Sequence, residues 1–350
     1  MAGEVAAAGR ATLQPPLRAL WVHNFDPGIP ASGVFMHILA DAVQALGVQV
    51  DMLYTGKLSR PLEAWRARAH LRWLAPQFDL VHAQYGSMCA WIGSAAPGPK
   101  LISIRGSDWY GIDGGPWSDR WHGALANRLT RWSTPRYDQV ISMSGRMKAE
   151  IEQYYAARGV VAPPVSVLTD GLSLEDFRPL PRAACRAALG AAGDERPWVL
   201  LTTIDEANPI KRVELAKAAV KEAQREIPDL QLKVASRIPH SAMPTWVNAC
   251  NLTLMTSMHE GWPNAIKESL ACGVPFVATD ISDLPEIARQ DPSCAIAPAD
   301  ARALGAAVVR CLGTPPITDL RSHVGHMDLP QVACSLRYLY LATLGRPCAA

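Results

Sequence analysis

Short runs rich in aliphatic and β-branched residues alternate with segments of helical spacing through the first half of the chain. The runs lie at 17–25, 48–54, 78–86, 100–108, 137–144 and 164–171. Between the first two runs, the segment 33–47 places its apolar residues at helical intervals, which is typical of a βαβ unit. Strands that alternate with helices predict a parallel sheet covered by helices on both faces.

A second series of the same kind follows. Strand-like runs at 198–204, 230–236, 252–257 and 275–280 alternate with helical segments at 211–226, 243–250 and 264–273. The segment 174–197 separates the two series; it is rich in proline, alanine and charge, and we place the domain boundary near Arg178. With 350 residues, of which 49% are hydrophobic, the chain can fill two cores. We expect an α/β fold of two doubly wound, Rossmann-like domains facing across a cleft, at 15–177 and 178–330. We also expect a C-terminal helix at 331–350, for which the first domain is the candidate packing partner.

The composition excludes several classes of partner. A formal charge of +2 does not make the chain a polycation, so we expect no nucleic-acid partner. The eight cysteines form no CxxC pair and no cluster at zinc spacing, so we expect reduced, structural thiols. We also expect no metal and no cofactor. The chain has no GxGxxG, no Walker A motif and no DxD. No run of 18 apolar residues occurs, and we expect a cytoplasmic protein, either soluble or peripherally attached at the inner membrane face.

The stretch EGWPNAIKE carries an acid at each end, Glu260 and Glu268. It follows a predicted strand; Pro263 suits the first helical position and Gly273 suits the helix end. The helix start between the acids would offer free N–H groups to a phosphate. Each carboxylate can accept hydrogen bonds from sugar hydroxyls. This order of groups matches a nucleotide sugar. The alternative is structural: Glu260 caps the helix and Glu268 pairs with Lys267 or with solvent.

The wider segment 256–288 closely resembles the donor-site signature of the large family of retaining GT-B glycosyltransferases that includes sucrose synthases and bacterial mannosyltransferases. The shared features are the E-x7-E pair, the Gly and Pro after the first Glu, the Gly-Val-Pro strand entry and the closing Pro-Glu-Ile. Segments 32–50, 78–86 and 165–181 extend the resemblance over most of the chain. It implies that Glu260 contacts the donor sugar and Glu268 the ribose. It also implies that the following backbone lies near the sugar and the phosphate, at Gly261, Trp262, Pro263, Asn264 and Ala265.

The resemblance implies further site residues. Lys211 follows a strand, at the position where the family has a lysine that contacts the donor diphosphate. The charge of that lysine takes the place of the metal ion of DxD enzymes. The family's arginine a few residues earlier is missing, and Arg212 is a candidate substitute. Arg105 stands where much of the family has a histidine near the reaction centre; arginine is no general base, so it would act as a charge and hydrogen-bond donor. Arg105, Lys211 and Glu260 are the catalytic candidates. Gly33 either lets the first loop approach the phosphate or the acceptor closely or is a plain turn glycine.

Two segments combine tryptophan with arginine. In 60–77, one helical stripe holds Leu62, Trp65, Ala69 and Trp73. We expect this stripe to pack on the sheet, with an anionic membrane surface as the alternative. The segment 108–132 holds four tryptophans together with Arg120, Arg128 and Arg131. Because aromatic rings stack on sugars and arginines suit anions, we expect the acceptor there, with Asp108 and Trp109 on the acceptor side.

These features favour a retaining, metal-independent transfer of a sugar from a nucleoside-diphosphate sugar to an acceptor hydroxyl. The acceptor would be a sugar, a lipid-linked sugar or a small molecule, in bacterial polysaccharide, glycolipid or secondary-metabolite synthesis. The resemblance implies attack on the same face as the leaving group, with a donor phosphate oxygen accepting the acceptor proton. The missing arginine and Arg105 keep two alternatives open. One is a catalytically silent GT-B protein that binds nucleotide sugar or a partner, and the other is a GT-B epimerase or phosphorylase.

Overall fold

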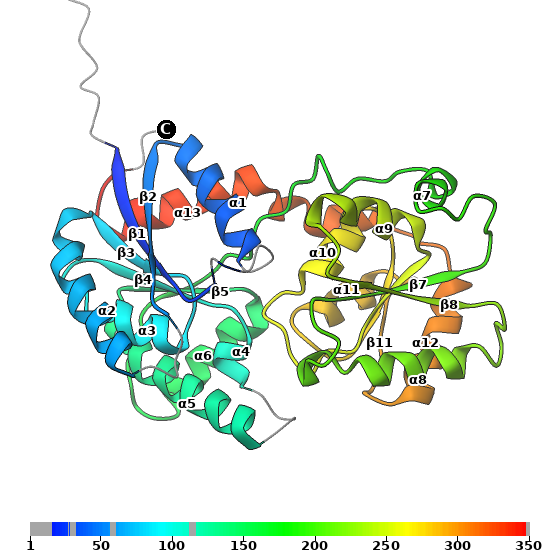
Figure 1. The fold of residues 1–350 in the computed structure, drawn as a ribbon, viewed down its shortest axis with the longest axis horizontal. Coiled ribbons are helices and arrows are strands. Elements are labelled where there is room, and N and C mark those ends of the chain that lie inside the picture. Colours follow the sequence, from blue (N-terminus) through cyan, green and yellow to red (C-terminus); the bar gives the residue numbers. More distant parts are fainter. Residues whose placement is uncertain (1–15, 27, 29–32, 57–60, 112–116, 348–350) are drawn as a thin grey trace, which may run out of the picture.

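Two α/β domains lie side by side in the protein (Figure 1). The computed structural model describes residues 16–347, except 27, 29–32, 57–60 and 112–116. Each domain has a parallel sheet with helices against it, which confirms the predicted fold of two doubly wound domains.

The first domain contains a six-stranded parallel sheet in the order β2-β1-β3-β4-β5-β6. Its strands are β1 (Leu17–His23), β2 (Val48–Tyr54), β3 (Leu80–Ala83), β4 (Lys100–Ile104), β5 (Gln139–Ser142) and β6 (Val165–Val167). Its helices are α1 (Val34–Ala45), α2 (Pro61–Leu74), η1 (Ala75–Gln77), α3 (Ser87–Gly93), α4 (Ser107–Tyr110), α5 (Trp117–Ser133), η2 (Thr134–Arg136) and α6 (Gly145–Ala156).

The second domain contains a five-stranded parallel sheet in the order β11-β10-β9-β7-β8. Its strands are β7 (Trp198–Thr203), β8 (Gln231–Ser236), β9 (Leu252–Met255), β10 (Phe276–Ala278) and β11 (Ala295–Ile296). The helices from α7 onward are α7 (Arg182–Ala188), η3 (Pro209–Lys211), α8 (Val213–Ala223), η4 (His240–Ala242), α9 (Met243–Ala249), α10 (Asn264–Ala271), α11 (Leu284–Gln290), α12 (Ala301–Leu312), η5 (Leu320–Met327) and α13 (Leu329–Thr343).

The strand orders place one switch point in each sheet. β1 lies between β2 and β3, and β7 lies between β8 and β9, so the chain leaves in opposite directions from neighbouring strands. Loops that follow such strands splay apart and leave a crevice at the carboxyl ends, where open α/β sheets bind ligands. In the second domain, Lys211 follows β7 and Glu260 follows β9. The fold alone therefore brings these two predicted site residues to one crevice.

The chain passes between the domains twice. After residue 178 it packs on the second domain: Leu180 N donates to Asn248 Oδ1 at 2.8 Å, and Arg186 Nε donates to the Ala249 carbonyl at 2.9 Å. At the other end, α13 returns to the first domain, where Trp21 Nε1 donates to the Tyr340 hydroxyl at 2.8 Å (Figure 1).

The expectation that the tryptophan stripe of 60–77 packs on the sheet is wrong. Leu62, Trp65 and Trp73 are 74%, 63% and 68% exposed. The buried stripe of α2 and η1 is instead Ala64, Leu71 and Ala75, which lies on the opposite side of the helix by 3.6-residue periodicity. Two alanines let the helix approach its neighbours closely, which leaves the large rings outside. No helix in the described ranges is long and apolar enough to span a bilayer.

Candidate functional site

The loop between β9 and α10 carries Glu260 to the carboxyl edge of the second sheet. α10 begins at Asn264, and Pro263 is its N-cap residue (φ −71°, ψ 117°) rather than its first helical residue. No side chain caps this helix, so the structural alternative for Glu260, a helix cap, does not apply. The first N–H groups of a helix have no partner within it, so this start can receive an anion.

Glu260 pairs with Lys211. Lys211 Nζ lies 2.5 Å from Glu260 Oε1, and the Ser257 hydroxyl donates to the same oxygen at 2.8 Å. Both side chains are partly exposed, 27% for Lys211 and 20% for Glu260. The η3 turn and the loop after β9 are also joined through their backbones, because Met258 N donates to the Ile210 carbonyl at 2.8 Å. A cation and an acceptor-only carboxylate therefore stand together at the mouth of the crevice.

Arg212 is bonded to backbone carbonyls of the second domain, whereas its neighbour Lys211 pairs with the Glu260 carboxylate. Its backbone is left-handed (φ 48°, ψ 50°), which turns the chain from η3 into α8. Its guanidinium donates to the carbonyls of Thr256 and Ser257, at 2.7 Å each, and burial lowers its pKa. Arg212 braces the Glu260 loop and is only partly available to the donor; it does not replace the missing arginine as a free cation.

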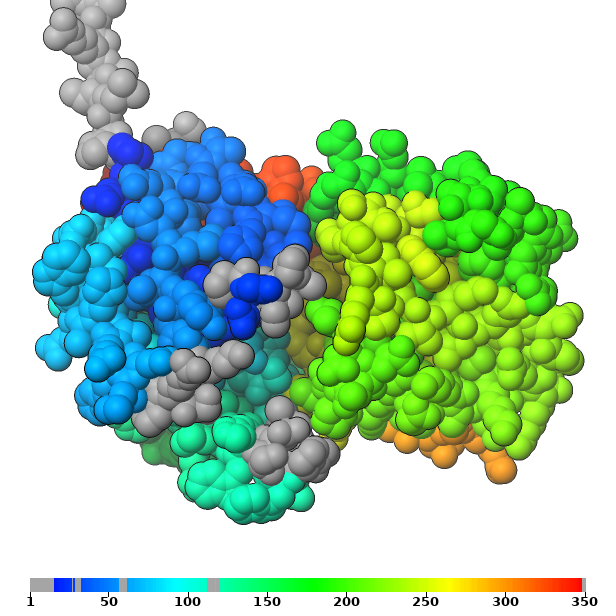
Figure 2. Space-filling view, in the orientation of Figure 1, coloured from blue at the N-terminus to red at the C-terminus, as the bar shows by residue number. Residues whose placement is uncertain are grey.

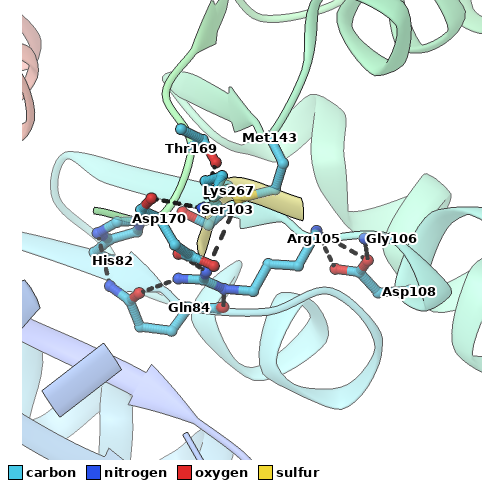
Figure 3. Close-up of polar contacts among 10 residues, drawn as sticks. All are labelled: His82, Gln84, Ser103, Arg105, Gly106, Asp108, Met143, Thr169, Asp170 and Lys267. Carbon is cyan, nitrogen blue, oxygen red and sulfur yellow. Dashed lines mark hydrogen bonds and ion pairs between the residues drawn. The ribbon is translucent and has the colours of Figure 1, made fainter. Parts of the chain in front are cut away.

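Arg105 forms the opposite wall, at the end of β4 (Figure 3). Its side chain is 8% exposed. Nε donates to the Gln84 carbonyl at 2.6 Å, Nη2 donates to Gln84 Oε1 at 2.9 Å, and Nη1 pairs with Asp170 Oδ1. The guanidinium also lies 4.3 Å from the centre of the Phe35 ring. These contacts fix the orientation of the planar guanidinium. A hydrogen-bond donor must be fixed in this way if it is to stabilise charge that develops during a reaction.

The Gln84 side chain is held in turn by His82. Its amide nitrogen lies 2.9 Å from His82 Nδ1, and His82 Nε2 lies 2.9 Å from Ser103 Oγ (Figure 3). The Tyr340 hydroxyl of α13 lies 2.7 Å from the same Nδ1. Burial lowers the pKa of His82 to about 3, so the ring is neutral and serves as a fixed partner.

The two predicted acceptor-side residues are both buried. The Asp108 carboxylate accepts hydrogen bonds from the backbone N–H groups of Arg105 and Gly106 (Figure 3). It also accepts one from Gly86 N, and so ties the β3 and β4 loops together. Burial raises the pKa of Asp108, and those N–H groups oppose the shift. Trp109 packs edge-on to Tyr154 at 5.3 Å and is 3% exposed. Neither side chain can touch an acceptor directly, because both are occupied within the first domain.

The two walls meet backbone to backbone at a pair of glycines. A Cβ at Gly261 would lie 2.0 Å from the Arg105 carbonyl oxygen, and a Cβ at Gly106 would lie 3.0 Å from Gly261 N. Only glycine allows this approach. The contact brings the Glu260 loop of the second domain against the Arg105 loop of the first. The space-filling view shows the surface hollowed between the two domains (Figure 2).

Lys267 contacts Asp170, the partner of Arg105, and the sequence interpretation missed this role. It is buried, its Nζ donates to the Thr169 hydroxyl at 3.0 Å and to the Asp170 carbonyl at 2.7 Å, and burial lowers its pKa to about 8 (Figure 3). It does not take Glu268 as its hydrogen-bond partner, so that structural alternative fails. A signal was present: Lys267 shares a helix face with Leu270 and Ala271, and a lysine on an apolar face needs a buried acceptor.

Glu268 contacts His240, which sequence reasoning also missed. His240 Nε2 lies 3.3 Å from Glu268 Oε1, and this contact raises the pKa of His240. The Phe177 ring lies 5.3 Å from the imidazole. His240 sits in the turn after β8, and a histidine in a loop at the carboxyl edge of the donor sheet was the available signal. Glu268 itself is buried, and its carboxylate lies against the His240 imidazole.

Gly33 occupies the left-handed region (φ 74°) directly before α1, where a Cβ would lie 2.8 Å from Phe25 Cβ. Conformation and crowding thus require glycine without reference to a ligand. Of the donor-loop residues, Trp262 and Pro263 are buried, Ala265 is half-buried, and Asn264 is exposed at the helix start. Glu260, Lys211, Gly261 and Arg105 are brought together. Gly33 lies two positions before Phe35, whose ring contacts the Arg105 guanidinium. Among the described residues, no group of three histidine, cysteine or acidic side chains could hold a metal.

Two family models match the chain. One, described as glycosyl transferases group 1, matches residues 206–314, and one described as glycosyltransferase family 4 matches residues 24–169. D-inositol 3-phosphate glycosyltransferase of Thermobispora bispora is 28% identical over 200 residues, which are 45% of each chain. The enzyme of the same name from Mycobacterium tuberculosis is 26% identical over 166 residues, 40% of this chain and 34% of the relative. The match spans less than half the length of these relatives.

Solved structures share the fold over nearly the whole chain. Sucrose-phosphate synthase from Thermosynechococcus elongatus superposes with a TM-score of 0.71 at 17% identity, over 94% of this chain and 99% of that one. Anabaena HepE in complex with UDP and glucose gives 0.63 at 14% identity, over 92% and 99%. The lipopolysaccharide galactosyltransferase WaaB gives 0.61 at 11% identity, over 93% and 99%.

Proposed function

The chain belongs to the GT-B glycosyltransferases, and on that premise we propose that it moves a sugar from a nucleoside-diphosphate sugar to an acceptor hydroxyl with retention of configuration. The observation that carries the proposal is the Lys211–Glu260 pair at the switch point of the second sheet. The loop that carries Glu260 meets the loop that carries Arg105 at the contact between Gly106 and Gly261.

The proposed donor lies along this edge with its parts in sequence. Sugar hydroxyls donate to Glu260, the diphosphate meets Lys211 and the N–H groups at the start of α10, and the ribose hydroxyls reach Glu268 beside His240. In the free protein Lys211 and Glu260 bond to each other, so the donor must replace that contact with its own bonds to the two side chains. HepE, a protein of this fold, has been seen with UDP and glucose, which supports testing UDP-glucose first.

The chemistry needs a stabilised leaving group more than a nucleophilic side chain. The acceptor oxygen attacks the anomeric carbon, the bond from that carbon to the β-phosphate oxygen breaks, and the acceptor proton passes to the departing phosphate oxygen. Lys211 balances the charge that grows on the diphosphate, and its cation is the reason we expect no metal requirement. In this proposal Arg105, held by Gln84 and Asp170, supplies positive charge beside the reaction centre. Attack on the leaving-group face gives retention.

The proposed acceptor is a sugar, a lipid-linked sugar or a small molecule that enters from the side of the first domain. We keep polysaccharide, glycolipid and secondary-metabolite synthesis as the settings to test. Because two relatives are named for an inositol phosphate acceptor, an anionic polyol belongs in the first set of acceptors.

A panel of UDP-, GDP- and ADP-sugars, each incubated with the protein in the presence of EDTA, tests the proposal through the release of free nucleotide. We expect slow release from one donor, and faster release when an acceptor is added. No release from any donor would contradict the proposal. Tight donor binding without release would instead identify a silent nucleotide-sugar-binding protein, and conversion of the sugar without an acceptor product would identify an epimerase.

A further inference from the structure

The first domain exposes an unusual number of tryptophans on α2 and α5. The exposed fractions are 63% and 68% for Trp65 and Trp73 on α2, and 73%, 58% and 49% for Trp117, Trp121 and Trp132 on α5. Tryptophan is a strongly buried residue on average, and an exposed group of apolar side chains on a folded domain marks an interaction site.

The outward stripe of α5 is regular. Trp117, Trp121, Leu125, Arg128 and Trp132 recur at three- and four-residue spacing and are all exposed. The inward side of the same helix holds buried Gly123, Asn127 and Thr130, which are small or polar. A surface helix of a soluble domain normally turns its apolar face inward. In α5 the rings point outward, which packing within the chain does not explain.

The stripe of α2 belongs to the same layer. Leu71 of α2, Ile92 of α3 and Leu129 of α5 pack in one core cluster, so the three helices cover one face of the sheet (Figure 1). Trp65 also lies edge-on to Trp91 of α3, with ring centres 5.0 Å apart. The outer sides of α2 and α5 therefore form one face of the domain, which we call the tryptophan face: Leu62, Trp65, Trp73, Trp117, Trp121, Leu125 and Trp132.

The charge around the tryptophan face is positive. α2 and α5 together contain six arginines against Glu63 and Asp119, while the whole chain has a formal charge of only +2. Exposed members of this set include Arg66, Arg72, Arg120 and Arg128. Positive charge is thus concentrated where the rings are exposed.

We propose that the tryptophan face docks on an anionic lipid bilayer. Indole rings prefer the headgroup region of a membrane, where one edge is apolar and the other is wet. Arginines beside them attract acidic lipid headgroups. α5 begins on the side of the first domain nearer the second, shortly after α4 and the Arg105 loop (Figure 1). Docking on this face would hold the first-domain wall of the cleft beside the bilayer surface.

Co-sedimentation of the full chain with vesicles tests this inference without reference to sugar transfer. The probes are vesicles of phosphatidylcholine alone and of phosphatidylcholine mixed with phosphatidylglycerol. We expect partitioning only into the mixed vesicles, and loss of most of that binding at high salt. Replacing Arg66 and Arg128 with Gln should lower the partition coefficient roughly fivefold for each arginine. The matched control is Arg302→Gln, an exposed arginine on α12 of the second domain.

The double variant Trp73→Ser/Trp121→Ser tests the aromatic part, with Ile317→Ser, at an exposed position of the second domain, as its control. We expect the tryptophan variant to lose vesicle binding and to keep the wild-type circular dichroism spectrum and unfolding temperature. Absence of wild-type binding to the mixed vesicles would overturn the inference, as would equal binding by the arginine variant. If sedimentation velocity showed a dimer that the tryptophan variant dissolves, with no vesicle binding, the face would be a contact between copies instead.

Discussion

Lys211 Nζ and Glu260 Oε1 lie 2.5 Å apart, although sequence reasoning assigns them to different parts of a donor. Lys211 follows β7 and Glu260 follows β9, neighbouring strands at the switch point of the second sheet. A partly desolvated cation needs a counter-charge, and Glu260 supplies it before any ligand arrives. The pair therefore holds both side chains in place, and a nucleotide sugar would replace their mutual contact with one bond to each.

Replacing Lys211 with Met should lower kcat/KM by roughly 100-fold to 1,000-fold, because the charge on the departing diphosphate loses its nearest cation. Initial rates of nucleotide release at several donor concentrations measure the effect. Lys217→Met is the matched control, because Lys217 is an exposed lysine on α8 that pairs with Glu214 outside the cleft. A Lys211 variant within twofold of wild type would show that the leaving group is stabilised elsewhere.

Arg105→Lys should lower kcat at least about tenfold while the protein stays folded, because a lysine keeps the charge but cannot reach Gln84 and Asp170 together as the planar fork does. Asp170→Asn should produce a smaller loss in the same direction, since it weakens one of those contacts. Single-turnover rates separate the chemical step from binding. Wild-type kcat in Arg105→Lys would mean that the fork geometry is irrelevant to transfer.

Gly261→Ala should force the two walls apart, because the new Cβ would lie 2.0 Å from the Arg105 carbonyl oxygen. Overpacking of this kind costs about 1–3 kcal/mol of stability, and here the strain falls on the site itself. We expect a large loss of kcat/KM and a modest fall in unfolding temperature. Gly313→Ala is the control, since its nearest atoms lie 3.7 Å away and its φ of −88° suits any residue. Equal activity of the two variants would contradict a closed contact between the walls during transfer.

The His240–Glu268 contact should stabilise the fold at low pH and not at high pH. Glu268 raises the pKa of His240 above its ordinary 6.5, so the folded protein holds the proton more tightly than the unfolded chain. The added stability is fully present below about pH 6.5 and disappears as the pH rises through the raised value. The unfolding temperatures of wild type and His240→Ala should therefore differ most in mild acid and converge in alkali. Exposed His122→Ala serves as the control. A difference independent of pH would rule out the ionic contribution.

Much of the fold follows from local pattern. Period-2 and period-3.6 spacing indicated the six strands of the first sheet and β7 to β10 of the second, but not β11. Pro263 and Gly273 marked the ends of α10 within a residue. The loop after β9 was predictable for the same reason, because a strand, a turn and a helix start are all encoded within a dozen positions.

Contacts between distant segments were not predictable. Lys267 bonds to the segment at Thr169 and Asp170, 97 to 98 positions earlier, and His240 lies 28 positions from Glu268. Which stripe of α2 is buried depends on how closely α3 approaches, and Ala64 allows a closer approach than Trp65. Composition alone could not distinguish a ring that packs inward from one that faces solvent.

The most direct test of the account compares how the wild type and Glu260→Ala bind a donor and its bare nucleoside diphosphate, by titration calorimetry with the donor found in the release assay. Glu260 is assigned to the sugar and Lys211 with the helix start to the diphosphate. The wild type should therefore prefer the nucleotide sugar, and Glu260→Ala should bind the two ligands with similar affinity. Loss of one good hydrogen-bonding carboxylate corresponds to about 1.5–3 kcal/mol of preference. Wild-type preference in Glu260→Ala, or no binding of either ligand by the wild type, would contradict the account.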